Sequence, residues 1–336
     1  MPTLYVMEPG AQVEKEYHRI LVTKEDEVLF RTPIQHISSL VLVGTVGLTT
    51  PAMYALLDNK IPVTLVRRSG DLIGQLIPSI SPNLELRRSQ LQFDKNENAK
   101  FLIAKEIVKA KIHNQRILAL RIIRRHPAIE AALEDKIREL EKSVADVNDL
   151  DELRGVEGVA ARFYFDIYEQ AFDPTWNFHN RNRRPPRDPI NALLSLGYTL
   201  LGNSLISTLQ ITGLDPYLGV FHEEQYGRPA LALDLLEEFR SPLIDSLVMT
   251  IINKKLINDK NFIYAQANEE EALPVELDDK ALRLFFREFS EKIDSTVMMN
   301  EAGRPIRYRK IFEIQARKLA KVISGREEKY CPFYAR

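Results

Sequence analysis

The sequence predicts an α+β fold, in which a small N-terminal β domain is followed by a larger all-α domain. Up to about residue 84, short runs rich in aliphatic and β-branched residues alternate with turn residues such as Gly44 and Gly70, a pattern typical of strands. After Pro82 and Asn83, apolar residues recur every three to four positions, which is the period of an amphipathic helix. With 336 residues and 45% hydrophobic content, the chain can bury one large core or two ordinary ones.

The β domain is assigned to residues 1–84. Its expected strands are the runs at residues 3–6, 19–22, 28–30, 40–43, 63–66 and 72–76. One helix is expected to start behind Thr50-Pro51, because proline is favoured in the first turn of a helix. Residues 85–95 are assigned to a linker.

The α domain is assigned to residues 96–325, and residues 326–336 to a C-terminal tail. Helical apolar spacing is found at residues 96–125, 128–145, 156–172, 189–211, 233–257, 279–293 and 305–324. Asp188-Pro189 supplies an N-cap and a first-turn proline for the fourth of these segments. The chain has no internal repeat and no low-complexity tract. The second domain is therefore expected to be almost entirely helical.

The run VFHEEQYGRPALALDLLEEFR, at residues 220–240, is the most informative candidate for a functional site. Asp234 and Glu237 are three residues apart in a segment of helical spacing, so their carboxylates lie near one face, one turn apart. Carboxylates on a half-buried face are costly unless they are paired, hydrogen-bonded or bound to a metal. His222, a dozen residues earlier and just before a Gly-Arg-Pro turn, can fold back to meet them. The spacing fits half of a metal site, but it also fits a solvated acidic face beside a surface or core histidine.

A second segment, GVEGVAARFYFDIYEQAF at residues 155–172, carries Glu157 at the expected head of a helix. A glutamate in a first helical turn interacts favourably with the helix dipole, so Glu157 has a structural explanation as well as a functional one. Arg162 and Tyr164 on the same helix are equally open. They are either a surface charge and a packing aromatic, or a phosphate contact and its neighbour.

A proline-rich loop between residues 177 and 189 is dense in arginine. The four residues are Arg181, Arg183, Arg184 and Arg187. Arginine presents a planar fork to phosphate oxygens. A basic loop can be simply solvated, but this density beside a predicted carboxylate site favours binding of a polyanion.

The net charge of −1 lacks the basic excess that is usual for nucleic-acid-binding domains. The charges are segregated, however. Residues 100–125 carry eight basic side chains against the single acid Glu106, and residues 304–321 are similarly basic, whereas acids gather at residues 130–152 and 269–279. Each run by itself is typical of a solvated helix face, so the charge pattern supports DNA binding without establishing it.

Nothing in the sequence predicts secretion or insertion into a membrane. The N-terminus MPTLYVMEPG lacks the basic and apolar regions of a signal peptide, and no apolar run approaches the length needed to span a bilayer. The lone Cys331 excludes an intramolecular disulfide. We therefore expect a cytoplasmic protein with no membrane partner.

Three ordered blocks of sequence resemble a known family. They are EGVAARFYF from Glu157, RRPPRDPINALLSLGYTLL from Arg183 and GLDPYLGVFHEEQYGRPALALDLLEEFR from Gly213. Each is similar to a core motif of the CRISPR-associated integrase-endonucleases of spacer acquisition, the Cas1 family. In addition, LTTPAMYALLDNKIPVTLVRRSGDLIGQL from Leu48 looks like the first domain of that family, and KAKIHNQRILALR from Lys109 looks like the start of its helical domain.

The resemblance implies a metal site and a reaction. It places the metal ligands on Glu157, His222 and Glu237, with Asp234 as an additional acidic residue at the site. These ligands would hold Mn²⁺ or Mg²⁺, because two carboxylates and one imidazole suit a fairly hard divalent ion. The 3′-hydroxyl of a short incoming DNA would attack a phosphodiester of the CRISPR repeat, and water would hydrolyse DNA at the same site.

The resemblance also implies partners. Arg162 and Arg228 are expected to approach DNA phosphates, and Tyr164, Arg183 and Arg184 are further candidates for DNA contact. The family acts as a homodimer, with much of the contact in the N-terminal domain, and two dimers are bridged by the small ferredoxin-like protein Cas2. A general metal-dependent DNA-repair nuclease and a non-catalytic DNA-binding scaffold remain as alternatives, because the residues alone do not specify the DNA.

Overall fold

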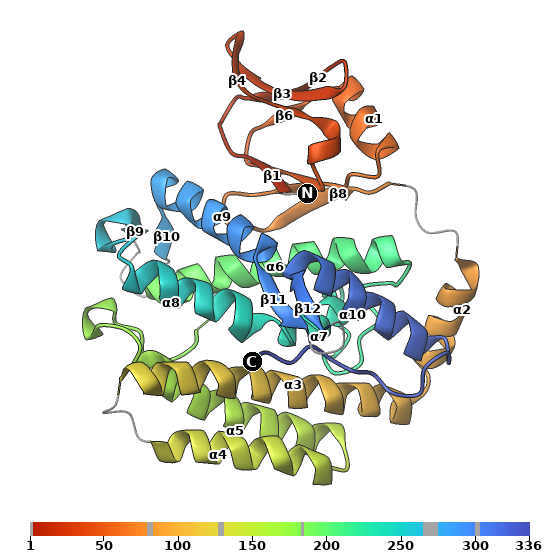
Figure 1. Ribbon diagram of the computed structural model, residues 1–336, viewed down its shortest axis with the longest axis vertical. Helices are drawn as coiled ribbons and strands as arrows, with labels where there is room; N and C mark the ends of the chain where they lie inside the picture. Colours follow the sequence, from red (N-terminus) through yellow and green to blue (C-terminus); the bar gives the residue numbers. More distant parts are fainter. Residues whose placement is uncertain (1–2, 79–82, 127–130, 183–184, 265–274, 300–302) are drawn as a thin grey trace.

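The protein consists of a β-rich N-terminal part that stands at one end of a larger helical part, as Figure 1 shows. The structure is a computed structural model that describes residues 3–78, 83–126, 131–182, 185–264, 275–299 and 303–336. The predicted fold class, a small β domain before a mostly helical one, is confirmed.

Two four-stranded sheets and one helix make up the N-terminal part. One sheet has the strand order β1-β5-β7-β8 and the other has the order β4-β3-β2-β6. In the first sheet, β5 pairs in parallel with β1 and β7, whereas β8 is antiparallel to β7. The elements are β1 (Thr3–Val6), β2 (Gln12–Glu16), β3 (Arg19–Lys24), β4 (Glu27–Pro33), β5 (Ser39–Val43), β6 (Gly47–Leu48), α1 (Thr50–Asp58), β7 (Val63–Val66) and β8 (Leu72–Leu76).

The apolar side chains of these strands form a separate small core. Val13, Ile20, Leu40 and Val63 are all 0% exposed and pack in one cluster with Leu56 of α1. All six predicted strands are present. The sequence pattern does not predict β2, because Val13 is the single apolar residue of QVEKE and one residue shows no period.

The segment between the two parts is a helix, where the sequence predicts a linker at residues 85–95. The helix α2 (Leu84–Phe93) is capped by Asn83, whose Oδ1 accepts a hydrogen bond at 3.1 Å from a backbone N–H three residues later. Gln90 on this helix is buried and exchanges two hydrogen bonds with the backbone of Asp215. The linker prediction is therefore wrong for most of its length, because an N-cap and a buried polar contact hold the segment against the helical part.

The helical part is interrupted by two short antiparallel strand pairs, so it is not entirely α. These pairs are β9 (Phe262–Tyr264) with β10 (Val275–Leu277) and β11 (Thr296–Met299) with β12 (Arg304–Arg307). The helices are α3 (Glu97–Arg125), α4 (Ala131–Ser143), α5 (Leu150–Glu169), α6 (Pro189–Thr212), α7 (Ala230–Glu237), η4 (Arg240–Asp245), α8 (Ser246–Asn253), α9 (Asp279–Asp294) and α10 (Tyr308–Ile323). Short 3₁₀ turns are η1 (Ile34–His36), η2 (Val144–Asp146), η3 (Pro174–Trp176) and η5 (Asp259–Asn261).

The helix predicted at residues 233–257 is divided in the structure. The helix α7 ends at Glu237, and the chain makes the π-helical segment η4 before α8 begins. Pro242 lies within η4, and proline cannot donate the backbone hydrogen bond that a regular α-helix requires. Single π-helical turns recur at functional sites, and this one begins three residues after Glu237.

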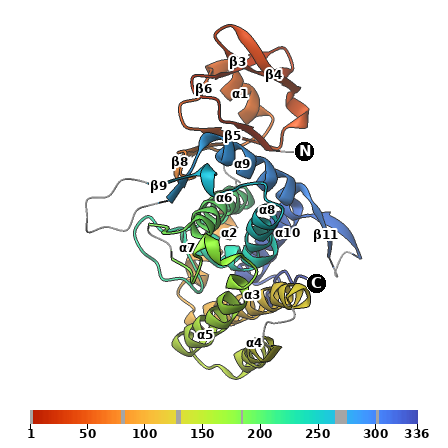
Figure 2. The same ribbon diagram turned by 90° about the vertical axis from the view of Figure 1, so that its left-hand side faces the viewer.

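The helix α3 is central to the helical part. It packs on one side against α4 and α5 and on the other side against α7 and η4. Figures 1 and 2 show α4 and α5 below it and α7 above it. Side chains of α3 can therefore reach both α5, which carries Glu157, and α7, which carries Glu237.

The helix α6 is, within the described part of the chain, the one helix long and apolar enough to cross a membrane. The prediction that no apolar run approaches that length is therefore wrong. In this structure 61% of its most apolar window is buried, and the helix packs against α7 and α10. Its apolar character is that of a core helix.

The end of the chain, predicted as a tail at residues 326–336, contributes to the core. Tyr330, Phe333 and Ala335 are buried. Asn114 on α3 donates from Nδ2 to the carbonyl of Phe333 at 3.0 Å and accepts at Oδ1 from the N–H of Ala335 at 2.7 Å. These last residues are therefore attached to the helix that lies at the centre of the domain.

Candidate active site

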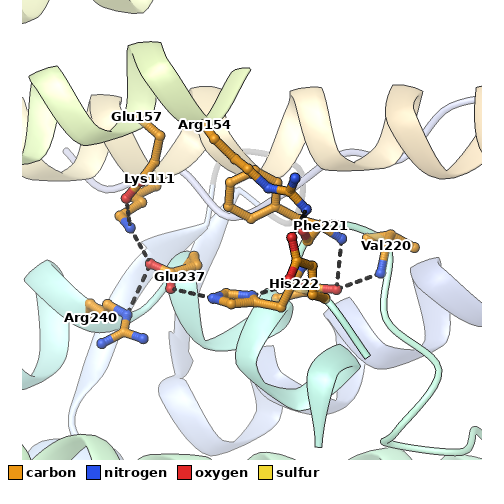
Figure 3. Close-up of polar contacts among 10 residues, drawn as sticks. Lys111, Arg154, Glu157, Val220, Phe221, His222, Glu237 and Arg240 are labelled. Atoms are coloured by element: carbon orange, nitrogen blue, oxygen red, sulfur yellow. Dashed lines mark hydrogen bonds and ion pairs between the residues drawn. The ribbon is translucent and has the colours of Figure 1, made fainter. Parts of the chain in front are cut away.

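Four elements bring charged side chains together at one place. Lys111 comes from α3, Glu157 from α5, Glu237 from the end of α7, and His222 from the loop that precedes α7. Figure 3 shows Lys111 between the two carboxylates and His222 on the other side of Glu237. The three predicted metal ligands are thus gathered in one cluster, with Lys111 among them.

Glu157 does not lie at the head of its helix. The helix α5 begins at Leu150, and Asp149 caps it by accepting hydrogen bonds from two backbone N–H groups of the first turn. Glu157 is two turns inside α5, where the helix dipole no longer stabilises a carboxylate. The helix-dipole explanation of Glu157 is therefore wrong, and a different partner must account for this partly buried carboxylate.

That partner is Lys111. Its Nζ donates a hydrogen bond to Glu157 Oε1 and lies 2.6 Å from Glu237 Oε2. Lys111 is 8% exposed and Glu237 is 3% exposed. Burial by itself would lower the pKa of Lys111, but Glu237 and Glu157 raise it above its usual value. Lys111 is therefore an ammonium ion held inside the protein by two carboxylates.

Arg240 is a second cation beside Glu237. Its Nε lies 2.9 Å from Glu237 Oε2, and its guanidinium carbon lies 4.5 Å from the centre of the Tyr198 ring. Burial by itself would raise the pKa of Glu237, but Arg240, Lys111 and His222 together lower it well below its usual value. Glu237 is therefore ionised throughout the neutral pH range.

Asp234 holds the loop that carries His222, which is called the histidine loop (residues 220–222). Its carboxylate accepts hydrogen bonds from the backbone N–H groups of Val220, Phe221 and His222, at 2.6, 3.2 and 2.9 Å. His222 Nδ1 lies 2.6 Å from Asp234 Oδ1, and since three donors already point at this carboxylate, the imidazole is the donor. With Nδ1 turned to Asp234, the other ring nitrogen, Nε2, faces Glu237 Oε1 at 3.6 Å.

The position of Asp234 therefore differs from that of the predicted ligands. Asp234 is 0% exposed and contacts His222 at Nδ1, the ring nitrogen that does not face Glu237.

The histidine loop follows a segment that passes very close to α7. At Gly219 a Cβ would lie 2.6 Å from the Cβ of Ala230 and 3.1 Å from Asp234 Oδ2. Glycine is required there, because any side chain would push the histidine loop away from its support.

The sequence does not predict that the three cations Lys111, Arg154 and Arg240 lie at this site. Arg154 lies one turn before Glu157, and Figure 3 shows it beside the histidine loop, with Nη2 3.4 Å from the carbonyl oxygen of Phe221. Lys111 lies in the KAKIHNQ block, and Arg240 follows Glu237 at the i+3 spacing of a helical ion pair. These are the signals that could have identified them, but the contacts themselves are visible only in the structure.

The residues predicted to contact DNA are in different environments. Arg162 is exposed on α5, with its guanidinium carbon 5.3 Å from the centre of the Phe163 ring, and Arg228 is partly exposed before α7. Tyr164, in contrast, is 0% exposed, and its hydroxyl donates to Asp245 Oδ2 at 2.6 Å. The prediction of a DNA contact by Tyr164 is therefore wrong for this structure, because the ring is part of the core.

In the basic loop, Arg183 and Arg184 lie outside the described residues. Arg181 is attached to α6, since its Nη2 donates to Ser195 Oγ at 3.0 Å. Its guanidinium carbon lies 5.3 Å from the centre of the Tyr198 ring, which is the ring that also contacts Arg240. One tyrosine ring thus joins the start of the basic loop to the carboxylate cluster.

The donor set fits a hard divalent cation. Two carboxylates and an imidazole suit Mn²⁺ or Mg²⁺, and the ammonium of Lys111 shows that a positive charge is stable between Glu157 and Glu237. Over the residues that the structure describes, no three acidic, histidine or cysteine side chains converge closely enough to hold a metal ion as they stand. Here Lys111 lies between two of the three predicted ligands.

Solved structures share this fold. A casposase bound to integration product aligns with 98% of this chain and 93% of its own, at a TM-score of 0.85 and 24% identity. A Cas1 protein from Thermotoga maritima aligns over 98% of both chains, at a TM-score of 0.78 and 24% identity. A chain of a Cas6-RT-Cas1–Cas2 complex matches 99% of this chain and 36% of its own, at a TM-score of 0.80 and 25% identity.

Sequence comparison identifies the family. The model of the family "CRISPR associated protein Cas1" matches residues 4–291. The CRISPR-associated endonuclease Cas1 1 of Moorella thermoacetica is 34% identical over 99% of this chain and 98% of its own length. A Cas4/Cas1 fusion from Rhodospirillum rubrum is 35% identical over 98% of this chain, which spans 57% of the fusion. The chain therefore belongs to the Cas1 family of CRISPR-associated proteins.

Proposed function

We propose that this protein is a metal-dependent DNA integrase and endonuclease that inserts short foreign DNA fragments into a CRISPR array. One observation carries the proposal. Glu237, ionised and 3% exposed, faces Nε2 of His222 at 3.6 Å and shares the ammonium of Lys111 with Glu157. The chain belongs to the Cas1 family, whose relatives are named endonucleases, and this supports the cluster as the proposed site of phosphodiester chemistry.

The residues Glu157, His222 and Glu237 would hold Mn²⁺ or Mg²⁺. When bound, the ion supplies Lewis-acid polarisation of a phosphate and stabilises the charge that develops in the transition state. Asp234 keeps His222 in the tautomer whose Nε2 can bind a cation. Arg240 keeps Glu237 ionised and oriented.

The proposed reaction is a transesterification. The 3′-oxygen of the incoming strand bonds to the phosphorus of a repeat phosphodiester while the bond from that phosphorus to the 3′-oxygen of the repeat strand breaks. The attacking hydroxyl gives its proton to solvent, and the leaving oxygen takes up a proton. With water as the nucleophile, the same steps hydrolyse DNA. No covalent protein intermediate is required. Tyr164 is unsuited to be a nucleophile, because burial and the neighbouring Asp245 raise the pKa of its hydroxyl well above the usual value.

DNA phosphates would meet the exposed arginines around this cluster. Arg162 on α5 and Arg228 before α7 are on the surface of the elements that carry the ligands, and Arg183 and Arg184 follow Arg181 in the basic loop. Arginine binds phosphate through paired hydrogen bonds, so we expect affinity that depends little on sequence and falls with salt.

The proposed protein partners are a second copy of the chain and Cas2. Strand β4 is an unpaired sheet edge within the described residues, and it exposes Val28, Leu29 and Phe30 by 45%, 49% and 48%. An exposed apolar edge strand favours association, which supports a homodimer through the N-terminal part. The neighbour in the Cas6-RT-Cas1–Cas2 complex is assembled with Cas2, which supports that partner here. We place the protein in the cytoplasm, with the DNA on which it would act.

A strand-transfer assay tests the proposal. The protein is incubated with Cas2, a short duplex with free 3′-hydroxyls, and either repeat DNA or an arbitrary duplex, with and without Mn²⁺ or Mg²⁺. We expect joined product with metal and repeat DNA. A His222→Ala protein should be inactive with an unchanged circular dichroism spectrum, whereas the matched control His36→Ala, at an exposed site in the N-terminal part, should remain active.

The same assay separates the alternatives. Equal activity on repeat and arbitrary duplex would identify a general repair nuclease. Binding of DNA without any reaction, in either metal, would identify a non-catalytic scaffold and overturn the proposal.

A further inference from the structure

Lys111 differs from its exposed neighbour on α3. Lys109 is exposed to solvent, whereas Lys111 is 8% exposed and its side chain points into the space between α5 and α7. There its ammonium contacts one carboxylate from each of those helices, Glu157 and Glu237 (Figure 3). A lysine buried in this way needs the two carboxylates as partners, because an unpaired buried ammonium is strongly unfavourable.

A metal ion held by Glu157 and Glu237 would compete with Lys111 Nζ for their carboxylate oxygens. These two residues are two of the three proposed ligands, and the third, His222 Nε2, lies 3.6 Å from the other oxygen of Glu237. An ammonium and a divalent cation seek the same oxygen atoms. Two such cations at contact distance repel each other strongly in a poorly solvated site, so both cannot stay between Glu157 and Glu237.

Arg240 has a different place in the cluster. It contacts Glu237 from the side of η4 and is held over the Tyr198 ring. Its contact is with one carboxylate, whereas Lys111 joins two. Arg240 can therefore remain in place when a metal binds, and Lys111 is the cation that has to move.

We propose that Lys111 is an exchangeable internal cation, which occupies the metal position of the metal-free protein and leaves it when Mn²⁺ or Mg²⁺ binds. This inference rests on the metal site of the proposed function. Without metal, Lys111 keeps two carboxylates together that would otherwise repel each other. Its flexible four-carbon stem allows the ammonium to swing out towards solvent on the side of Glu157, whose side chain is 21% exposed against 3% for Glu237.

Two consequences follow for the metal-free and metal-bound protein. The ligands are held close to their working positions before the metal arrives, so the fold does not depend on the metal. Each metal ion must, however, break the pairing of Lys111 with both carboxylates. Lys111 therefore lowers the affinity for the metal while it stabilises the metal-free site.

The test compares Mn²⁺ binding, by calorimetric titration of metal-free protein, in the wild type, Lys111→Met and the control Lys109→Met. Methionine keeps the unbranched apolar stem without the charge. Lys111→Met should bind Mn²⁺ at least about tenfold more tightly than the wild type, because no ion pair has to be broken. Its melting temperature should be lower without metal and should rise more on saturation with Mn²⁺. Lys109→Met should match the wild type in both measurements.

The outcomes separate this inference from the function on which it rests. Unchanged or weaker Mn²⁺ binding by folded Lys111→Met overturns the role of Lys111 and leaves the metal site standing. Absence of Mn²⁺ and Mg²⁺ binding by the wild type overturns both. If Lys111→Met does not fold without metal, the double variant Lys111→Met/Glu157→Gln decides, since it leaves Glu237 paired with Arg240. Recovery of metal-free folding supports the inference, and failure to recover assigns Lys111 to packing and overturns it.

Discussion

Glu237 and Glu238 are adjacent in the sequence and both are buried, yet their surroundings differ in kind. Glu237 faces the two cations Lys111 and Arg240. Glu238 is 0% exposed and accepts hydrogen bonds from neutral donors, which are the hydroxyl of Tyr330, Nε2 of Gln315 at 2.9 Å and the backbone N–H of Phe333 at 2.7 Å. Successive residues of a helix point about 100° apart, which follows from 3.6 residues per turn, so the two carboxylates reach different sides of the chain.

The difference shows how environment assigns a role to a buried carboxylate. Burial by itself would raise the pKa of both groups. At Glu237 the cations outweigh burial and lower the pKa, so the carboxylate is ionised and able to take up another cation. At Glu238 the neutral donors offset burial only in part, and the pKa is raised to about 7. The first carboxylate suits metal binding, and the second ties α10 and the C-terminal segment to the core.

The pair of variants Glu237→Gln and Glu238→Gln tests this difference between the two carboxylates most directly. Glu237→Gln should reduce Mn²⁺ affinity and strand transfer by more than about a hundredfold, beyond what is usual for residues that only support a ligand. Glu238→Gln should retain both, because its contacts are with the core. The two losses are measured by titration with Mn²⁺ and by strand-transfer rates at pH 7, with circular dichroism as the control for folding. Equal losses in the two variants would contradict the distinct roles.

The pH dependence of stability should distinguish the same two residues. The folded pKa of Glu238, about 7, lies above its ordinary value of 4.5. Its contribution to stability is therefore fully present below about pH 4.5 and is lost as the pH rises through about 7. A shift of this size corresponds to about 3 kcal/mol at about 1.4 kcal/mol per unit. The lowered pKa of Glu237 places its own effect below pH 4.5, where stability is lost as the pH falls.

Urea unfolding between pH 5 and 8 measures this dependence. The free energy of unfolding of the wild type should decline over that range relative to Glu238→Gln, which has no group to titrate there. Parallel profiles for the two proteins would show that Glu238 does not hold its proton in the folded state.

Asp234→Asn tests a third kind of buried carboxylate, one that supports a ligand. The amide cannot accept all four hydrogen bonds that Asp234 accepts, so His222 loses the partner that fixes its tautomer. We expect a loss of about 10- to 100-fold in Mn²⁺ affinity and strand transfer. Asp166→Asn, at an exposed site on α5, is the matched control. A loss as large as that of Glu237→Gln would make Asp234 a ligand, and no loss would deny its support of His222.

The fold was predictable where the evidence is local. The strands β1, β7 and β8 and the helix α6 follow from runs and periods within the segments themselves. The π-helical segment η4 was not predicted, because the apolar spacing continues through Pro242. The helix α2 was not predicted either, because it depends on a contact with a distant part of the chain. For α2 this is the buried pairing of Gln90 with Asp215.

The candidate site was predictable only in part for the same reason. Glu157, His222 and Glu237 were identified from motif blocks that resemble a family, whereas the local pattern LLEEFR does not distinguish Glu237 from Glu238. Lys111 belongs to a helix far from both carboxylates in the sequence, so no spacing rule brings it to them. Its role depends on the packing of α3 between α5 and α7.

The smallest expected effect concerns Asp245, a further buried carboxylate that accepts hydrogen bonds from neutral donors. It is 1% exposed and accepts hydrogen bonds from the hydroxyls of Tyr164 and Tyr198. Tyr164→Phe removes one of these donors and should cost about 1 kcal/mol of stability. Strand transfer and DNA affinity per folded molecule should not change.

Arg162→Ala, at an exposed position on the same helix, should instead keep stability and lower DNA affinity. The slope of the logarithm of the binding constant against the logarithm of the salt concentration should be smaller by about 1. If Tyr164→Phe weakened DNA binding at unchanged stability, the tyrosine would have to leave the core to reach DNA, and the distinction between structural and functional groups on α5 would fail.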